Sequence, residues 1–187
     1  GGLYGSQGRF KEAEELLLRV LEERERALGT EHTKTIKVTL KLAQLYNKWQ
    51  RFDEAEPFCL RVIEARERAL GADHPNTVRA VRHLAALRMG QSRYDEAETI
   101  YVKVLKVIEG FYGPNHPSTG GALSDLASVY INQSRYADGE PLLRRSVAGA
   151  IKTYGIHHPE TATYSNNLGE LLRHIENFDD AEHYYLQ

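Results

Sequence analysis

The chain has 187 residues, and its 24 lysines and arginines nearly balance its 26 aspartates and glutamates, which leaves a net charge of −2. This balance argues against a protein that binds nucleic acid, because such proteins carry a clear positive excess. The sequence also lacks the roughly 18 to 20 consecutive apolar residues of a membrane span and the features of a signal peptide. The single cysteine, Cys59, cannot form an intramolecular disulfide, so we expect a cytoplasmic protein that uses Cys59 in its core.

Two sequence markers recur every 42 residues, from position 9 to 51 to 93 to 135 to 177. The first marker is a basic or polar residue followed by an aromatic one: Arg9-Phe10, Arg51-Phe52, Arg93-Tyr94, Arg135-Tyr136 and Asn177-Phe178. The second is a glycine with a histidine three residues later and a threonine six residues later, beginning at Gly29, Gly71, Gly113 and Gly155. These markers divide the chain into units 1–28 (partial), 29–70, 71–112, 113–154 and 155–187 (truncated), which together form one repeat array.

Apolar residues spaced by three and four predict two helices in each unit. In the unit 29–70 they run from about Thr35 to Gln50 and from about Phe52 to Leu70. The first helix has the inward residues Val38, Leu42, Leu45 and Tyr46, and the second has Phe52, Ala55, Cys59, Val62 and Leu70, with Tyr112 as the counterpart of Leu70 one unit on. A lone pair of helices buries too little to be stable, so each unit must pack on the next. We therefore expect an all-α fold, an α-α superhelix (solenoid) of antiparallel helical hairpins.

Glycines and prolines mark the ends of the predicted helices. The four marker glycines are expected to end the second helices in a left-handed conformation, and Pro75, Pro117 and Pro159 to occupy the first position of the next helix. Pro57 and Pro141 are expected within a first helical turn, where proline is tolerated. Residues 3–8 match the end of a first helix, and Gln187 falls roughly ten residues before a second helix should finish, so we expect a fragment of a longer array.

The assembled motifs resemble the tetratricopeptide repeat, in the variant of 42-residue units found in the kinesin light chain type. The resemblance rests on Phe52-Asp53-Glu54-Ala55-Glu56-Pro57, Leu70-Gly71-Ala72-Asp73-His74-Pro75 and Ser165-Asn166-Asn167-Leu168-Gly169-Glu170-Leu171, and it covers the whole chain. It implies a superhelix whose concave face is lined by the first helices and binds an extended peptide. Asparagines recur before the core leucine in this type, and here only Asn166 and Asn167 match, so the cargo specificity of a motor adaptor does not follow.

Helical spacing places one stripe of each first helix on the side opposite its inward face. The residues of this stripe vary from unit to unit, because they do not take part in packing between repeats. In the units 29–70 and 71–112 this stripe holds three lysines, two arginines and no acid, a local charge of +5. We expect it to receive Asp or Glu side chains, a phosphorylated group or a C-terminal carboxylate of a partner, with Arg79 and Arg82 donating paired hydrogen bonds. In later units Ser124 also falls on the stripe, and asparagines there are expected to bind the peptide backbone. The predicted peptide-binding residues are Lys37, Lys41, Asn47, Lys48, Arg79, Arg82, His83, Asn132, Asn166, Asn167 and Arg173. The alternative is a helix face that is merely solvated.

Nothing in the sequence points to catalysis, a cofactor or a metal. The phosphate-binding loop, the nucleophile elbow and the His-Glu-x-x-His zinc helix do not occur. Four of the eight histidines repeat at the same corner of each unit, about ten ångström apart by helix packing, and are expected to cap or pack helices rather than share an ion. The acidic residues that follow the first marker fit helix starts.

The first functional hypothesis is a peptide-binding adaptor module, a protein-interaction scaffold that is not an enzyme. It is expected to bind an acidic protein or peptide rather than nucleic acid or membrane. A competing hypothesis is a structural spacer or oligomerisation segment of a larger multidomain signalling or motor-adaptor protein, with self-association through its cut repeat ends.

Overall fold

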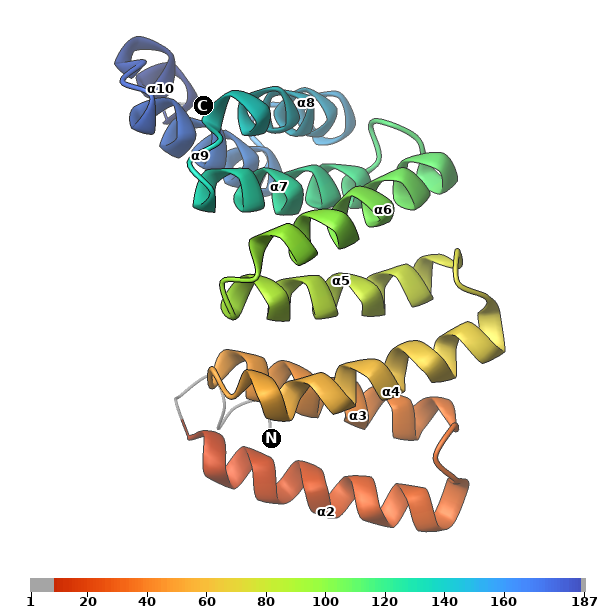
Figure 1. Ribbon diagram of the computed structural model, residues 1–187. Coiled ribbons are helices and arrows are strands. Elements are labelled where there is room, and N and C mark those ends of the chain that lie inside the picture. Colours follow the sequence, from red (N-terminus) through yellow and green to blue (C-terminus); the bar gives the residue numbers. More distant parts are fainter. Residues whose placement is uncertain (1–8, 186–187) are drawn as a thin grey trace. The chain divides into compact units, whose positions relative to one another are not determined.

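The structure, a computed structural model, describes residues 9–185, and every regular element within them is a helix. In chain order these are α2 (Phe10–Leu28), α3 (Thr33–Lys48), α4 (Phe52–Leu70), α5 (Pro75–Gly90), α6 (Tyr94–Tyr112), α7 (Pro117–Asn132), α8 (Tyr136–Tyr154), α9 (Pro159–His174) and α10 (Phe178–Tyr185) (Figure 1). The predicted second helix of the unit 29–70 is confirmed, and its first helix lies two residues earlier than expected at both ends. The expectations for residues 3–8 and for Gln187 lie outside the described residues.

The chain forms two compact units, residues 1–93 and 94–187, and the division falls between the two helices of the sequence repeat 71–112. Within the first unit α2, α3, α4 and α5 pack consecutively and antiparallel, and α3 also contacts α5 (Figure 1). Within the second unit α6 to α10 pack in the same manner, and α7 contacts α9. In each unit the first helices of successive repeats therefore lie beside one another, as the sequence predicts.

The core of each unit consists of the residues that the helical spacing selects. In the first unit Val38, Leu42, Leu45 and Tyr46 of α3 are buried, together with Ala55, Cys59 and Val62 of α4. In the second unit the largest core cluster includes Ala127, Leu143, Leu168 and Leu171. Leu70 and Tyr112 were expected on the inward face but are exposed, because they are the last residues of α4 and α6, where the helix ends.

The marker histidines, threonines and prolines shape the corners between repeats. His32, His74, His116 and His158 are helix N-caps, and each Nδ1 accepts a hydrogen bond from the backbone N–H two residues later, at 3.1 to 3.2 Å. The hydroxyls of Thr35, Thr119 and Thr161 donate to the carbonyl oxygen of the preceding marker glycine, at 2.7 to 2.8 Å. Pro75, Pro117 and Pro159 occupy the first helical positions, as predicted. The recurring histidines are thus explained by helix capping.

Two predictions about the turns were wrong in detail. The marker glycines do have positive φ, but their ψ, such as 160° at Gly71, is extended rather than left-handed helical. Left-handed residues instead follow the first helices, at Gln50, Ser92, Ser134 and Glu176, with φ of 58 to 60°. Pro57 and Pro141 are each the sixth residue of a helix, α4 and α8, and so lie beyond the first turn, because these helices already begin at Phe52 and Tyr136.

The arginine of the first marker links successive second helices. Arg51 donates to Glu54 through Nε at 2.7 Å and to Glu14 of α2 through Nη1 at 3.0 Å. Its guanidinium lies 4.4 Å from the ring centroid of Trp49, which in turn stacks on Phe10 at 5.5 Å. Trp49 therefore packs at the turn rather than standing free.

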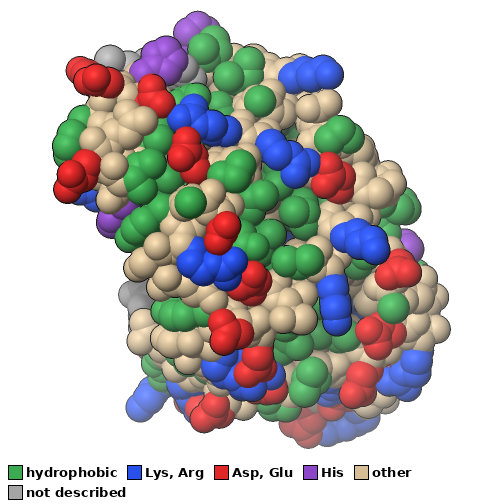
Figure 2. Space-filling view, turned by 45° about the horizontal axis from the view of Figure 1, so that its top comes forward, with side chains coloured by type: hydrophobic (Ala, Val, Ile, Leu, Met, Phe, Trp, Pro, Cys, Tyr) green, Lys and Arg blue, Asp and Glu red, His purple; other side chains and the backbone are tan. Residues whose placement is uncertain are grey.

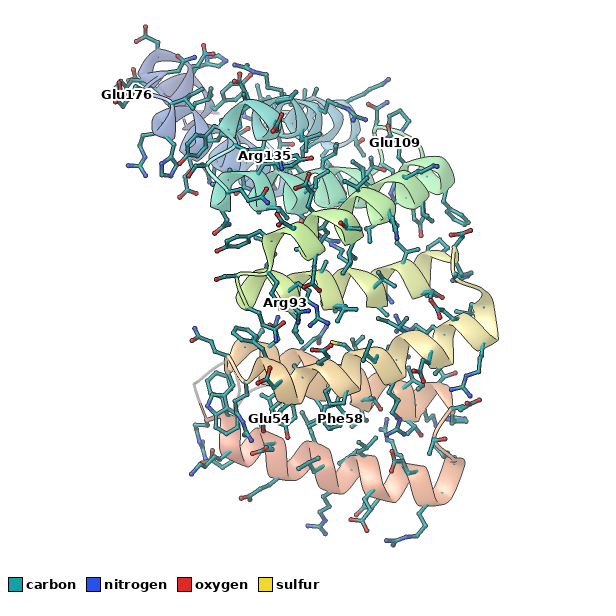
Figure 3. All side chains as sticks on the ribbon, viewed as in Figure 1. Glu54, Phe58, Arg93, Glu109, Arg135 and Glu176 are labelled. Atoms are coloured by element: carbon teal, nitrogen blue, oxygen red, sulfur yellow. The ribbon has the colours of Figure 1, made fainter. Side chains whose placement is uncertain are left out.

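The same arrangement recurs in the second unit. Arg135, labelled at the start of α8 in Figure 3, donates to Asp138 at 2.8 Å and to Glu98 at 2.7 Å. Its guanidinium lies 4.4 Å from the ring centroid of Tyr130. Basic and acidic side chains are accordingly interspersed on the face that Figure 2 shows. The acidic residues at helix starts therefore serve the scaffold, as predicted.

Candidate peptide-binding site

The predicted basic residues of the first unit lie on α3 and α5 and remain accessible. Lys37, Lys41, Lys48 and Arg79 are exposed. Asn47, Arg82 and His83 are half-buried, and the Nε2 atoms of His83 and Gln44 lie 3.2 Å apart. In the part of the chain that the structure describes, the exposed side chains of Lys37, Lys41, Lys48 and Arg79 are therefore open to a ligand.

A pocket of about 220 Å³ lies at one end of this stripe. Lys37 from α3, Arg66 from α4 and Arg79 from α5 line it, so that three helices each contribute one cation. Ile36 and Ala65 add an apolar wall. We refer to this feature below as the basic pocket.

The sequence predicts two of these three cations and misses Arg66. Residues of the second helices were assigned to packing between repeats, and Arg66 sits in the last turns of α4, where the helix passes beside the starts of α3 and α5. Its Nη1 donates to the carbonyl oxygen of Asn76 at 2.5 Å. Arg24, one repeat earlier, makes the same bond to Lys34 at 2.7 Å, so the recurrence of arginine at this register was the available signal.

Positive charges accumulate around the basic pocket. Burial, followed by the nearby charge of Arg79, lowers the pKa of Arg66. Burial and the charges of Arg82, Arg66 and Arg79 lower the pKa of His83. Burial is the larger cause of both pKa shifts, and the neighbouring positive charges add to it.

Acidic residues compensate little of this charge. Glu31 also lines the basic pocket, but its carboxylate forms an ion pair with Arg68. Among the described residues, Lys37, Arg66 and Arg79 form no ion pair with an acidic side chain. The basic pocket therefore combines exposed cations, a partly buried guanidinium and an apolar wall, which suits the end of an anionic side chain.

The predicted residues of the second unit lie on α7 and α9 and do not line the basic pocket. Asn132, Asn166 and Arg173 are exposed, and Asn167 is half-buried. The Asn132 side-chain amide donates to the Ser128 carbonyl oxygen of its own helix at 2.7 Å, which commits one of its donors.

Two further side chains of the second unit contact neighbours within that unit. Ser124, expected on the exposed stripe, is instead buried, because its hydroxyl lies 3.2 Å from that of Ser146. His174 is stacked on Tyr136 at 5.5 Å.

Within the described residues there is neither a metal-binding cluster nor a membrane-spanning helix. No three His, Cys, Asp or Glu side chains there are grouped so that they could hold a metal ion. No helix described by the structure has the length and apolar character to cross a membrane.

A family model for the tetratricopeptide repeat matches residues 1–58, 79–131 and 119–187. No curated protein matches the sequence significantly. The resemblance inferred from the repeat motifs is thereby confirmed at the level of the family.

Several solved structures are similar to the chain. A Podosopora anserina protein described as a kinesin light chain with nearly identical TPR-like repeats is 23% identical, with a TM-score of 0.79 over 97% of this chain and 85% of that one. BtubC (BKLC) of P. vanneervenii is 20% identical, with a TM-score of 0.79 over 98% of this chain and 73% of that one. A STAND protein of Pyrococcus horikoshii with a tetratricopeptide repeat sensor is 18% identical, with a TM-score of 0.74, and the match covers 96% of this chain but only 26% of that protein. At these identities the likeness shows the fold, which confirms the predicted all-α repeat class.

Proposed function

Because the chain belongs to the tetratricopeptide repeat family, whose repeats generally serve as protein-interaction modules, we propose that it binds an extended acidic segment of a partner protein. The segment lies in the concave groove of the first helices and meets α3 and α5 of the first unit. The protein acts as a scaffold without a catalytic step of its own.

One observation carries this proposal: basic side chains from α3, α4 and α5 line one pocket and form no ion pair with an acidic side chain among the described residues. The Glu31 carboxylate in the same pocket is paired with Arg68 instead. Other arginines of the first unit are paired with carboxylates, as Arg51 is with Glu14 and Glu54 and Arg88 is with Glu56. Cations that a fold leaves unmatched around a pocket favour an anionic ligand.

The remaining predicted residues extend the contact. Lys41, Asn47 and Lys48 continue the stripe along α3, and their exposed or half-buried side chains can follow an extended chain. For the second unit by itself, we propose that Asn132, Asn166, Asn167 and Arg173 of α7 and α9 hydrogen-bond the backbone or polar side chains of a peptide. Affinity is expected on the order of micromolar, because an unstructured ligand loses entropy on ordering and exposed ion pairs contribute little.

A charge reversal tests the proposal. Isothermal titration with a peptide rich in aspartate and glutamate is compared for the wild-type chain and for the double variant Lys37→Glu, Arg79→Glu. Each reversal replaces an attraction of about 0.2–1 kcal/mol with a repulsion of similar size, so the double variant should lose about 1–4 kcal/mol, or roughly 5- to 800-fold in affinity.

The matched control is Lys103→Glu, Lys106→Glu, which changes the net charge equally on exposed positions of α6. It should retain near wild-type affinity. Equal losses of affinity in both double variants would show that binding depends only on the net charge of the protein. Unchanged affinity in the Lys37→Glu, Arg79→Glu variant would show that these two residues do not contact the peptide.

A further inference from the structure

We propose that the basic pocket of Lys37, Arg66 and Arg79 receives a phosphate monoester, so that the acidic segment carries a phosphorylated side chain at this point. This inference rests on the proposed function and specifies the chemistry of one of its contacts. A phosphorylated group and a carboxylate were both compatible with the sequence, and the arrangement of the three cations distinguishes them.

The number and origin of the donors favour phosphate over carboxylate. A carboxylate has one negative charge and two oxygens, which a single guanidinium fork can satisfy. A phosphate monoester carries about −1.5 to −2 charges at pH 7 and three acceptor oxygens. Three cations from α3, α4 and α5 match the three acceptor oxygens of the second ligand, and its larger negative charge compensates more of their positive charge than a carboxylate would.

Arg66 is the residue that distinguishes the basic pocket from an ordinary exposed basic surface. Lys37 and Arg79 are exposed on first helices and could serve any passing anion, whereas Arg66 is half-buried. Its hydrogen bond from Nη1 to the Asn76 carbonyl oxygen fixes the guanidinium and leaves its other N–H groups free to donate. A fixed guanidinium loses little entropy when it binds an oxyanion.

The group of three cations does not recur in the second unit. In the second unit the residues at the registers of Lys37, Arg66 and Arg79, two repeats along, are Gly121, Ala150 and Thr163, all neutral. The helices there pack in the same order without these cations. Packing of the repeats therefore does not require the three cations together, which favours a ligand at this place.

The pocket also offers polar and apolar groups suited to a phosphorylated side chain. Thr33 and Asn76 line it beside the cations, and Ile36 and Ala65 can contact the methylene or methyl of a phosphoserine or phosphothreonine. The Glu31 carboxylate at the same pocket is paired with Arg68, which limits its repulsion of an incoming anion.

The test uses two degenerate peptide libraries, one with a fixed central phosphoserine and one with a fixed central glutamate in the same surroundings. Retention of each on the immobilised chain is measured for the wild type and for two arginine variants. Arg66→Ala removes a pocket donor together with its bond to the Asn76 carbonyl oxygen. Arg24→Ala removes the equivalent bond to the Lys34 carbonyl oxygen without touching the pocket, and so controls for the structural loss.

Wild type and Arg24→Ala should retain the phosphoserine library at least about 10-fold better than the glutamate library, and Arg66→Ala should lose that preference. Equal retention of both libraries by the wild type would overturn the phosphate inference and leave the proposed function intact. No retention of either library would contradict both.

A second measurement follows the arginine side-chain N–H resonances during titration with inorganic phosphate and, separately, with acetate. Phosphate should shift Arg66 and Arg79 more than acetate does, at concentrations well above those needed with the phosphopeptides. Equal shifts with the two ions would refute the inference. Saturation by free phosphate at lower concentration than by the phosphoserine library would assign the pocket to a free ligand and refute the peptide as its source.

Discussion

Removing the carboxylate of Glu56 should destabilise the first unit, because Arg88 would then be left buried and without its main partner. The Arg88 side chain is only 9% exposed, and Nη1 and Nη2 donate to the two Glu56 oxygens at 2.8 and 2.5 Å. Breaking a buried pair on one side costs about 3–5 kcal/mol. Because Glu56 is 28% exposed and Gln91 still accepts from Arg88 at 3.0 Å, we expect about 2–3 kcal/mol for Glu56→Ala.

Urea denaturation followed by circular dichroism measures this cost. Equivalent positions of other repeats hold Tyr46, Tyr130 and the fully buried Leu172, so an apolar residue fits the place of Arg88. The double variant Glu56→Ala, Arg88→Leu should therefore recover most of the loss. A cost below about 0.5 kcal/mol for the single variant, or a double variant as unstable as the sum of its parts, would refute the reasoning.

The ion pair between Glu56 and Arg88 also makes the stability of the first unit depend on pH. The hydrogen bond and charge of Arg88 lower the pKa of Glu56, although burial opposes them. A carboxyl whose pKa is lower in the folded state contributes stability that is fully present above its unfolded value of about 4.3 and is lost as pH falls through its folded value. The difference in stability between wild type and Glu56→Ala should consequently shrink below about pH 4.

Three further outcomes are expected. Gly155→Ala should lower the free energy of unfolding by about 1–3 kcal/mol, because a backbone with φ 89° and ψ 165° is accessible to glycine but strained for other residues. An unchanged melting temperature would contradict this prediction. His116→Ala should cost about 0.5–2 kcal/mol of stability, because it removes an N-cap that also stacks on Tyr112. The control variant His157→Ala, at an exposed position, should be nearly neutral. Equal melting temperatures for the two variants would contradict a stabilising role of the histidine caps. Burial raises the pKa of Cys59 to about 11, so a thiol reagent at neutral pH should modify it only when the unit opens, and fast labelling of the folded protein would show otherwise.

Much of the fold follows from the sequence, because packing between repeats of the same architecture requires the same residue types at the packed positions. His74 and Thr77 keep their spacing for the same reason that Leu42 and Ala43 do: each occupies a place that every repeat must fill. The left-handed turn residues were missed because Gln50 and Glu176 give no glycine signal at positions where the repeat nevertheless requires positive φ.

The candidate site could be predicted only in part. Helical periodicity identifies which face of α3 or α5 is open, and Lys37 and Arg79 lie where it places them. The position of Arg66 depends on how the end of α4 passes its neighbours, which is a property of packing between helices rather than of spacing within one. Arg88 was not foreseen as a buried cation for the same reason, since its partner Glu56 lies 32 residues away.

Amide chemical-shift mapping with the acidic peptide addresses the location of the ligand without any substitution. If the ligand binds where the unmatched cations converge, saturable shifts should concentrate in α3, in the end of α4 around Arg66 and in the start of α5 around Arg79. Shifts confined to the outer faces of α2 and α4, or spread without saturation over all exposed lysines and arginines, would show that the basic pocket is not a binding site.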